Sequence, residues 1–125
     1  MIWEKVFFLV GLSGTTTSMR QSIGPILANP QTRAFLLDLM REVVAIGLSC
    51  GVNLGKEYAE ERLAFYDSLP ASMTSSMHHD LDESRRLELP WLSGAVSSLA
   101  YEKGVSAPLN RAISDVLALY AEGRR

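Results

Sequence analysis

The stretch from Asn29 to Val52 constrains the fold most strongly, because helical start and stop signals enclose one uninterrupted apolar pattern. Asn29 can cap a helix, and Pro30 suits the first helical position. Gly51 followed by Val52 has the chemistry of a Schellman end, in which glycine takes a positive φ and the next side chain packs back. Apolar and small residues recur between these signals at helical spacing: Phe35, Leu36, Leu39, Val43, Ile46, Gly47 and Cys50. We predict a helix with one buried face and a buried, unreactive Cys50 thiol.

Similar signals predict helices in the rest of the chain, over about residues 56–69, 76–83, 86–103 and 108–120. Pro90 is tolerated only in a first turn, so the third of these helices should start near Arg86–Glu88. Gly104 followed by Val105 repeats the stop signal of the central helix. We expect a frayed tail after the last helix.

The segment from Ile2 to Gly11 is apolar on nearly every side, with Lys5 as its cation. Both a buried helix and a buried strand fit this segment. Gly14 and the small polar residues around it weaken a helix there, so we expect a break or a close helix contact. Pro25 should exclude a regular helix through the two residues before it.

Composition limits the classes of protein to consider. The chain has 125 residues, 47% of them hydrophobic and 21% charged, with a net charge of −2. These values predict one domain over residues 1–125, and the scattered charges argue against a nucleic-acid partner. The N-terminal apolar run is shorter than the ~20 residues of a membrane span and has no cleavage site, so we expect a cytoplasmic location. Convincing strand alternation is absent, which predicts an all-α fold of five to seven helices in one layered bundle.

Polar residues are dense between Ser75 and Glu88, immediately before an apolar helix. Either serine at the start, Ser75 or Ser76, can cap a short helix, and one hydroxyl could instead bind a carboxylate. Glu88 suits the N-terminal end of a helix dipole, and Lys5 alone would be a solvated cation. Adjacent residues on a helix point about 100° apart, so His78 and the histidine after it should not share a metal ion.

Taken together, these residues resemble the C-terminal domain of the ketopantoate reductase (2-dehydropantoate 2-reductase) family. Trp3-Glu-Lys5 resembles the family's Trp-x-Lys, and Arg41-Glu-Val-Val followed by Gly51-Val52 resembles its central helix end. The longest match is Ser76-Met77-x-x-Asp80, Arg86-x-Glu88-x-x-x-Leu92-x-Gly94 and Gly104-Val105-x-x-Pro108-x-Asn110. The resemblance covers nearly the whole chain.

The resemblance implies an oxidoreductase domain like the helical C-terminal domain of 6-phosphogluconate dehydrogenase-type reductases. The family transfers hydride from NADPH to a 2-oxo acid, converting ketopantoate to pantoate in pantothenate biosynthesis, and an N-terminal Rossmann domain holds the cofactor. By matching position, Lys5 would be the catalytic general acid, and Glu88 would pair with Lys5 or bind the substrate hydroxyl. Ser76 would bind the substrate carboxylate, Ser13 would also face the substrate, and Asp80 would have a capping role.

Three positions depart from the family pattern. Asparagines are usual four and eight residues after the lysine, where this chain has Leu9 and Ser13, and Ile23 stands in place of a further substrate-side asparagine. Because these changes remove amide hydrogen bonds, we expect a substrate more apolar than ketopantoate, or different at its hydroxyl end.

The chain has no Gly-x-Gly-x-x-Gly phosphate-binding motif, and the family's Rossmann domain is absent from it. We therefore expect no NADPH binding and no turnover by the isolated chain. The family's interdomain surface would be exposed, which favours a homodimer. The alternative function is a free-standing helical dimerisation or interaction module without catalysis.

Overall fold

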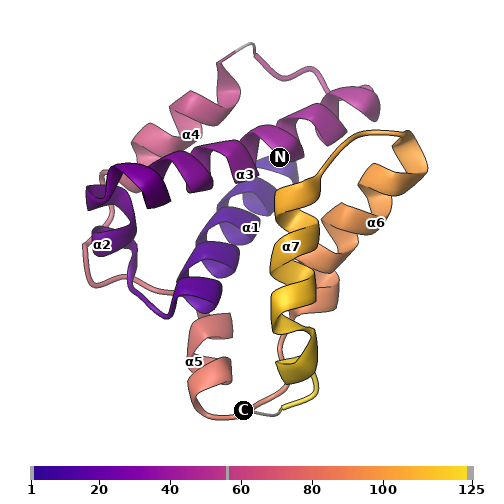
Figure 1. Ribbon diagram of the computed structural model, residues 1–125. Helices are drawn as coiled ribbons and strands as arrows, with labels where there is room; N and C mark the ends of the chain where they lie inside the picture. The colour runs from indigo at the N-terminus through magenta and orange to yellow at the C-terminus, as the bar shows by residue number, and fades with distance from the viewer. Residues whose placement is uncertain (1, 56, 124–125) are drawn as a thin grey trace.

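The computed structural model describes residues 2–55 and 57–123. Over these residues the chain forms seven α-helices, two 3₁₀ turns and one isolated bridge, so the all-α prediction is confirmed (Figure 1). The elements are α1 (Ile2–Met19), α2 (Ile23–Ala28), α3 (Pro30–Ser49), α4 (Tyr58–Tyr66), α5 (Ser76–Asp82), η1 (Leu89–Trp91), α6 (Ser93–Lys103), α7 (Pro108–Leu117) and η2 (Ala118–Tyr120). The predicted helix start at Lys56 and the tail at Arg124–Arg125 lie outside the described residues.

Helix α3 has the predicted bounds and caps. The Oδ1 atom of Asn29 accepts hydrogen bonds from Gln31 N at 2.9 Å and Thr32 N at 3.2 Å. Gly51 has φ +81°, and Val52 N donates to Gly47 O at 3.0 Å, which is the Schellman bond. The prediction of a buried Cys50 was wrong, because this residue is the exposed C-cap of α3, beyond the last regular turn.

Helix α1 is continuous through both of its glycines, which resolves the open choice between helix and strand. The glycines permit close helix packing, since a Cβ added at Gly14 would lie 3.0 Å from Ile113 Cδ1. The hydroxyls of Thr15, Thr16 and Ser18 donate to the carbonyl oxygens four residues earlier at 2.7, 2.7 and 2.6 Å. These bonds satisfy the three hydroxyls within the helix and allow Thr15 and Thr16 to be buried.

Helix α2 contradicts the expectation that Pro25 excludes a helix here. Ile23 N donates to Met73 O at 2.8 Å, and Gly24 N donates to Ala71 O at 2.9 Å. Pro25 is the third residue of α2, where an N–H has no intrahelical partner, so the missing donor is harmless. The distant loop therefore provides the hydrogen bonds that local sequence could not.

The helix predicted from residues 86–88 to 103 begins later than expected. Pro90 lies in the short turn η1, and Leu92 then adopts φ −113° and ψ −101°, which is not helical. Regular α6 starts at the following residue and ends as predicted, since Gly104 has φ +68° and Val105 N donates to Ala100 O at 2.9 Å. Glu88 consequently precedes η1 and not the first turn of α6.

The helices pack around α1 and α3, which cross near the middle of the molecule (Figure 1). Helices α6 and α7 lie side by side and both contact α3, while α5 lies against α1 near its C-terminal end. One buried cluster joins α1, α2, α3, α4 and α6, and a second lies between Leu39, α5 and α7. Near the end of the chain, Leu87 N donates to Ala121 O at 2.9 Å, beside the bridge between Arg86 and Glu122. None of the described helices is long and apolar enough to cross a bilayer.

Candidate functional site

Three of the residues singled out in the sequence lie along one side of α1. Lys5, Leu9 and Ser13 are spaced four residues apart, so they fall on neighbouring turns of one helix face. Lys5 is exposed, Leu9 is 37% exposed, and Ser13 is buried with 4% exposure. The rise of an α-helix separates the first and last of these residues by about 12 Å. The face thus changes along its length from a cation to an aliphatic side chain to a buried hydroxyl.

A groove of about 440 Å³ opens beside this face, between α1, α3 and α6. Lys5 is the charged residue of its lining, and the other side chains are aliphatic: Val6, Leu9, Val10, Val43, Ile46, Leu92, Ala95, Val96 and Leu99. The volume lies within the range of small-molecule sites, about 300–1,000 Å³. Such a groove fits a ligand with a polar or anionic end at Lys5 and an apolar body.

A second hollow, of about 300 Å³, lies on the other side of Lys5 and includes Arg62, Phe8, Phe65, Tyr66 and Met40. The Arg62 guanidinium carbon lies 5.7 Å from the centre of the Phe65 ring, within reach of a cation–π interaction. Among the carboxylate side chains that the structure describes, which do not include that of Glu4, none forms an ion pair with Lys5 or Arg62. The Lys5 ammonium therefore stands between two hollows with its charge available to a ligand.

The two serines at the start of α5 have different environments. Ser75 is buried, and its Oγ accepts from His78 N at 3.1 Å, which makes it the N-cap. Ser75 Oγ also lies 2.7 Å from Thr16 Oγ1, and Thr16 uses its own hydrogen on Leu12 O. Ser75 is therefore the donor in that pair, and both its donor and acceptor capacity are used. Ser76, in the first turn of α5, is exposed and has no such commitment within the described structure.

The bond between Ser75 and Thr16 places the start of α5 one turn beyond Ser13 on α1. Ser76 therefore lies toward the C-terminal half of α1, whereas Lys5 lies near its N-terminal end. Glu88 is exposed, precedes η1, and does not line the groove beside Lys5. In the described part of the chain, Lys5 and Glu88 form no ion pair with each other. Lys5, Ser13 and Ser76 are thus distributed along α1, with the groove at the Lys5 end.

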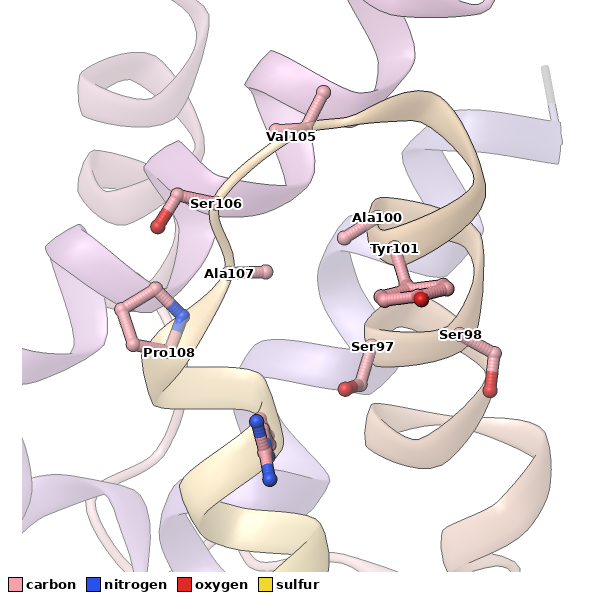
Figure 2. Close-up of a pocket in the computed structure, with 9 residues that line it drawn as sticks. Ser97, Ser98, Ala100, Tyr101, Val105, Ser106, Ala107 and Pro108 are labelled. Atoms are coloured by element: carbon pink, nitrogen blue, oxygen red, sulfur yellow. The ribbon is translucent and has the colours of Figure 1, made fainter.

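A more polar hollow, of about 510 Å³, lies between the C-terminal half of α6 and the start of α7 (Figure 2). Ser97, Ser98 and Tyr101 of α6 contribute to its lining, with Ser97 pointing toward α7, and Ser106 lies on the connecting loop. The backbone amides at the start of α7 are already occupied, because Leu109 N donates to Glu42 Oε2 at 2.8 Å. This hollow therefore lacks the free amides that would favour an anion, and the residues predicted from sequence do not line it.

Sequence reasoning missed the walls of the Lys5 groove and the second cation. Leu92 and Leu99 lie at core spacing in the helix predicted over about residues 86–103, but they also line the groove. Ala95, three residues after Leu92 and four before Leu99, widens this apolar face and was the available signal. Ile23, by contrast, is fully buried in the core, so its departure from the family pattern does not alter an exposed ligand surface.

Residues 1–121 match the model of the ketopantoate reductase PanE/ApbA C-terminal family. A 2-dehydropantoate 2-reductase of Halobacterium salinarum is 30% identical over 118 residues, and an uncharacterised oxidoreductase of Bacillus subtilis is 28% identical over 119 residues. These alignments cover 94% and 95% of this chain but 39% of each relative. A dimeric ketopantoate reductase of Staphylococcus aureus superposes with a TM-score of 0.89 at 24% identity, over 96% of this chain and 42% of that protein.

The all-α fold and the match to the family model define a helical C-terminal domain of an oxidoreductase family. The chain belongs to the ketopantoate reductase C-terminal domain family. It spans about two fifths of the length of the relatives that it matches.

Proposed function

We propose that this chain is the substrate-binding domain of an NADPH-dependent 2-oxo acid reductase, acting together with an N-terminal Rossmann domain. The observation that carries the proposal is the exposed Lys5 ammonium, which has no carboxylate partner in the described structure and borders a groove of ligand size. NADPH, held by the other domain, would supply the hydride. The family's reaction, ketopantoate to pantoate, is the starting model for the substrate.

Lys5 would act on the oxygen of the reacting ketone. Hydride addition to the carbonyl carbon places the electron pair of the C=O π bond on oxygen, and a positive charge nearby stabilises that developing alkoxide. The ammonium then donates its proton to the oxygen, which gives the 2-hydroxy acid and leaves a neutral amine to recover a proton from water. Among the described side chains no carboxylate competes for Lys5, which supports this role.

The remaining residues would hold the substrate. Ser76 is available for the substrate carboxylate because Ser75 takes over the capping of α5. Ser13 lies on the same face of α1 as Lys5, beyond the groove, and would contact the carboxylate end of the substrate and not its side chain. Glu88, which forms no direct pair with Lys5, would bind the hydroxyl that forms at the reduced carbon and not a group on the substrate's side chain.

The decisive experiment uses the polypeptide in which this chain is joined to its nucleotide-binding domain. Lys5→Gln should lower kcat for 2-oxo acid reduction by about 10²–10⁴-fold, because a general acid and a local positive charge are both removed. Lys103→Gln, at an exposed lysine in the last turn of α6, is the matched control and should leave kcat unchanged. Equal activity of Lys5→Gln and the unaltered protein would refute the proposal.

The isolated chain should neither bind NADPH nor reduce a 2-oxo acid, and titration of NADPH fluorescence against residues 1–125 checks this. Micromolar binding would contradict it. We also propose a cytoplasmic location, with which the single exposed Cys50 thiol is compatible.

A homodimer is part of the same proposal, and the Staphylococcus aureus relative is a dimer. Val116 and Leu119 are 64% and 80% exposed near the end of α7, and Leu48 is 52% exposed at the end of α3. These apolar side chains also favour the second candidate, a free-standing interaction module without catalysis. Sedimentation of residues 1–125 tests self-association. A clean monomer at high concentration would count against both the homodimer of the reductase and the free-standing interaction module.

A further inference from the structure

We infer that the groove beside Lys5 selects 2-oxo acids whose side chain is wholly apolar, and that Leu9 is the residue that sets this preference. The inference rests on the proposed function and specifies its substrate class. It depends on the make-up of the groove, in which Lys5 is accompanied by nine aliphatic residues from three helices.

The geometry assigns different ends of the ligand to different residues. Leu9 lies one turn from Lys5 on the same helix face and is 37% exposed, whereas the residues that follow it, from Val10 to Thr17, are buried. A 2-oxo acid with its ketone oxygen at Lys5 would therefore direct its side chain past Leu9 toward Leu92 and Leu99. Each methylene of the substrate that is buried against these side chains should raise kcat/KM, by about tenfold or more in a well-fitted pocket.

A hydroxyl on that side chain would find no hydrogen-bond partner among the groove residues other than the Lys5 amine. Lys5 is already engaged with the ketone oxygen in this arrangement. A hydroxylated acid such as ketopantoate would therefore lose hydrogen bonds to water without replacing them. Ser13, which could accept or donate, is one turn further along α1 and does not line the groove.

The test compares two acids that differ at one group. Ketopantoate and 3,3-dimethyl-2-oxopentanoate have the same carbon framework around the ketone, but the first ends in a hydroxyl where the second ends in a methyl. We expect the two-domain protein to prefer the methyl compound by about 10–100-fold in kcat/KM. Leu9→Asn should reduce this preference at least tenfold by supplying a hydrogen-bonding amide. Ala64→Asn, which adds the same amide at an exposed site on α4, should not alter it.

A second readout uses residues 1–125 with labelled methyl groups. The methyl compound should shift the signals of Leu9, Leu92 and Leu99 at lower concentration than ketopantoate does. If both acids are reduced equally well and Leu9→Asn leaves the ratio unchanged, the specificity inference is wrong while the reductase function stands. If neither acid is reduced by the two-domain protein nor shifts a groove signal, the proposed function fails, and this inference fails with it.

Discussion

The Glu42 carboxylate on α3 binds Asn110 on α7 twice, accepting from its backbone N at 2.9 Å and from its side-chain Nδ2 at 2.8 Å. The other carboxylate oxygen accepts from Leu109 N. Glu42 therefore serves as the N-cap of a helix that starts 66 residues later, a position where a negative charge is favoured by the helix dipole. Ala107, the local residue before α7, provides no side-chain cap of its own.

Glu42→Ala should lower the free energy of unfolding by about 2–3 kcal/mol, since it leaves buried amide donors of α7 without an acceptor. Urea denaturation followed by circular dichroism measures this change. Glu61→Ala, at an exposed glutamate on α4, is the matched control and should stay within about 0.5 kcal/mol of the unaltered chain. Equal midpoints for the two variants would show that the cap contributes nothing.

The two serines of α5 should separate stability from ligand binding. Ser75→Ala removes the N-cap and the contact with Thr16, and it should destabilise the chain by about 1–2 kcal/mol. Ser76→Ala should leave stability within about 0.5 kcal/mol but weaken 2-oxo acid binding, since that hydroxyl is exposed. The comparison uses the free energy of unfolding from urea denaturation and the dissociation constant for the 2-oxo acid, both measured on each variant. A stability loss at Ser76 as large as that at Ser75 would reject this division.

Gly11→Ala should destabilise the fold although alanine favours helices. A Cβ at Gly11 would lie 2.7 Å from the Tyr66 hydroxyl, which donates to Phe8 O at 2.7 Å. Burial raises the pKa of Tyr66, so the hydroxyl remains a donor at neutral pH. We expect this overlap to lower the free energy of unfolding by about 1–3 kcal/mol, which outweighs the gain of about 1 kcal/mol from the higher helix propensity of alanine.

Tyr66→Phe is the rescue for that variant, because it removes the oxygen that Cβ would meet. In a double-mutant cycle, Gly11→Ala should cost less than half as much in the Tyr66→Phe background as it does alone. Thermal unfolding of the four chains gives the coupling energy. Additive effects would mean that the crowding lies with Leu36, the next nearest contact at 3.2 Å.

Asp67 should contribute a small, pH-dependent stabilisation. Its carboxylate accepts two hydrogen bonds from Arg33 at 2.7 and 2.8 Å, and the hydrogen-bonded guanidinium lowers the pKa of Asp67. The contribution is present above the unfolded-state pKa, which is about 3.9, and is lost as pH falls through the lower folded-state value. Since both side chains are partly exposed, Asp67→Asn should cost less than about 1 kcal/mol at pH 7.

The measurement for Asp67 is the difference in unfolding free energy between the unaltered chain and Asp67→Asn across acidic and neutral pH. The difference should shrink toward zero at the acidic end and should also fall in high salt. A difference that grows on acidification would contradict the sign argued here.

Local sequence signals predicted those parts of the fold that depend on local chemistry. Asn29, Gly51 and Gly104 fixed helix ends because capping bonds form within a few residues of them. The start of α2 was missed because its hydrogen bonds come from residues 71 and 73, far along the chain. The delayed start of α6 was missed because the position of Pro90 indicates only that a first turn lies there. It does not reveal that the backbone leaves the helical conformation at Leu92.

Residues of the candidate site that belong to a sequence motif could be named from the sequence, whereas the groove walls, which depend on helix packing, could not. The order and spacing of Lys5, Ser76 and Glu88 in the chain made them candidates, and their roles stay predictions. The groove depends on how closely three helices approach one another, so its walls were not separable from core positions in the sequence. Leu92 lines the groove and also packs against both buried clusters, which is why periodicity alone could not assign it.

The backbone bond from Leu87 to Ala121 joins the last described turn to the residue just before Glu88. Shortening the chain at residue 120 would therefore release that carboxylate from its anchor, although the removed residues contact no ligand themselves. An affinity tag for purification is better attached away from this end, because a bulky extension there could disturb the Leu87–Ala121 bond and so displace Glu88.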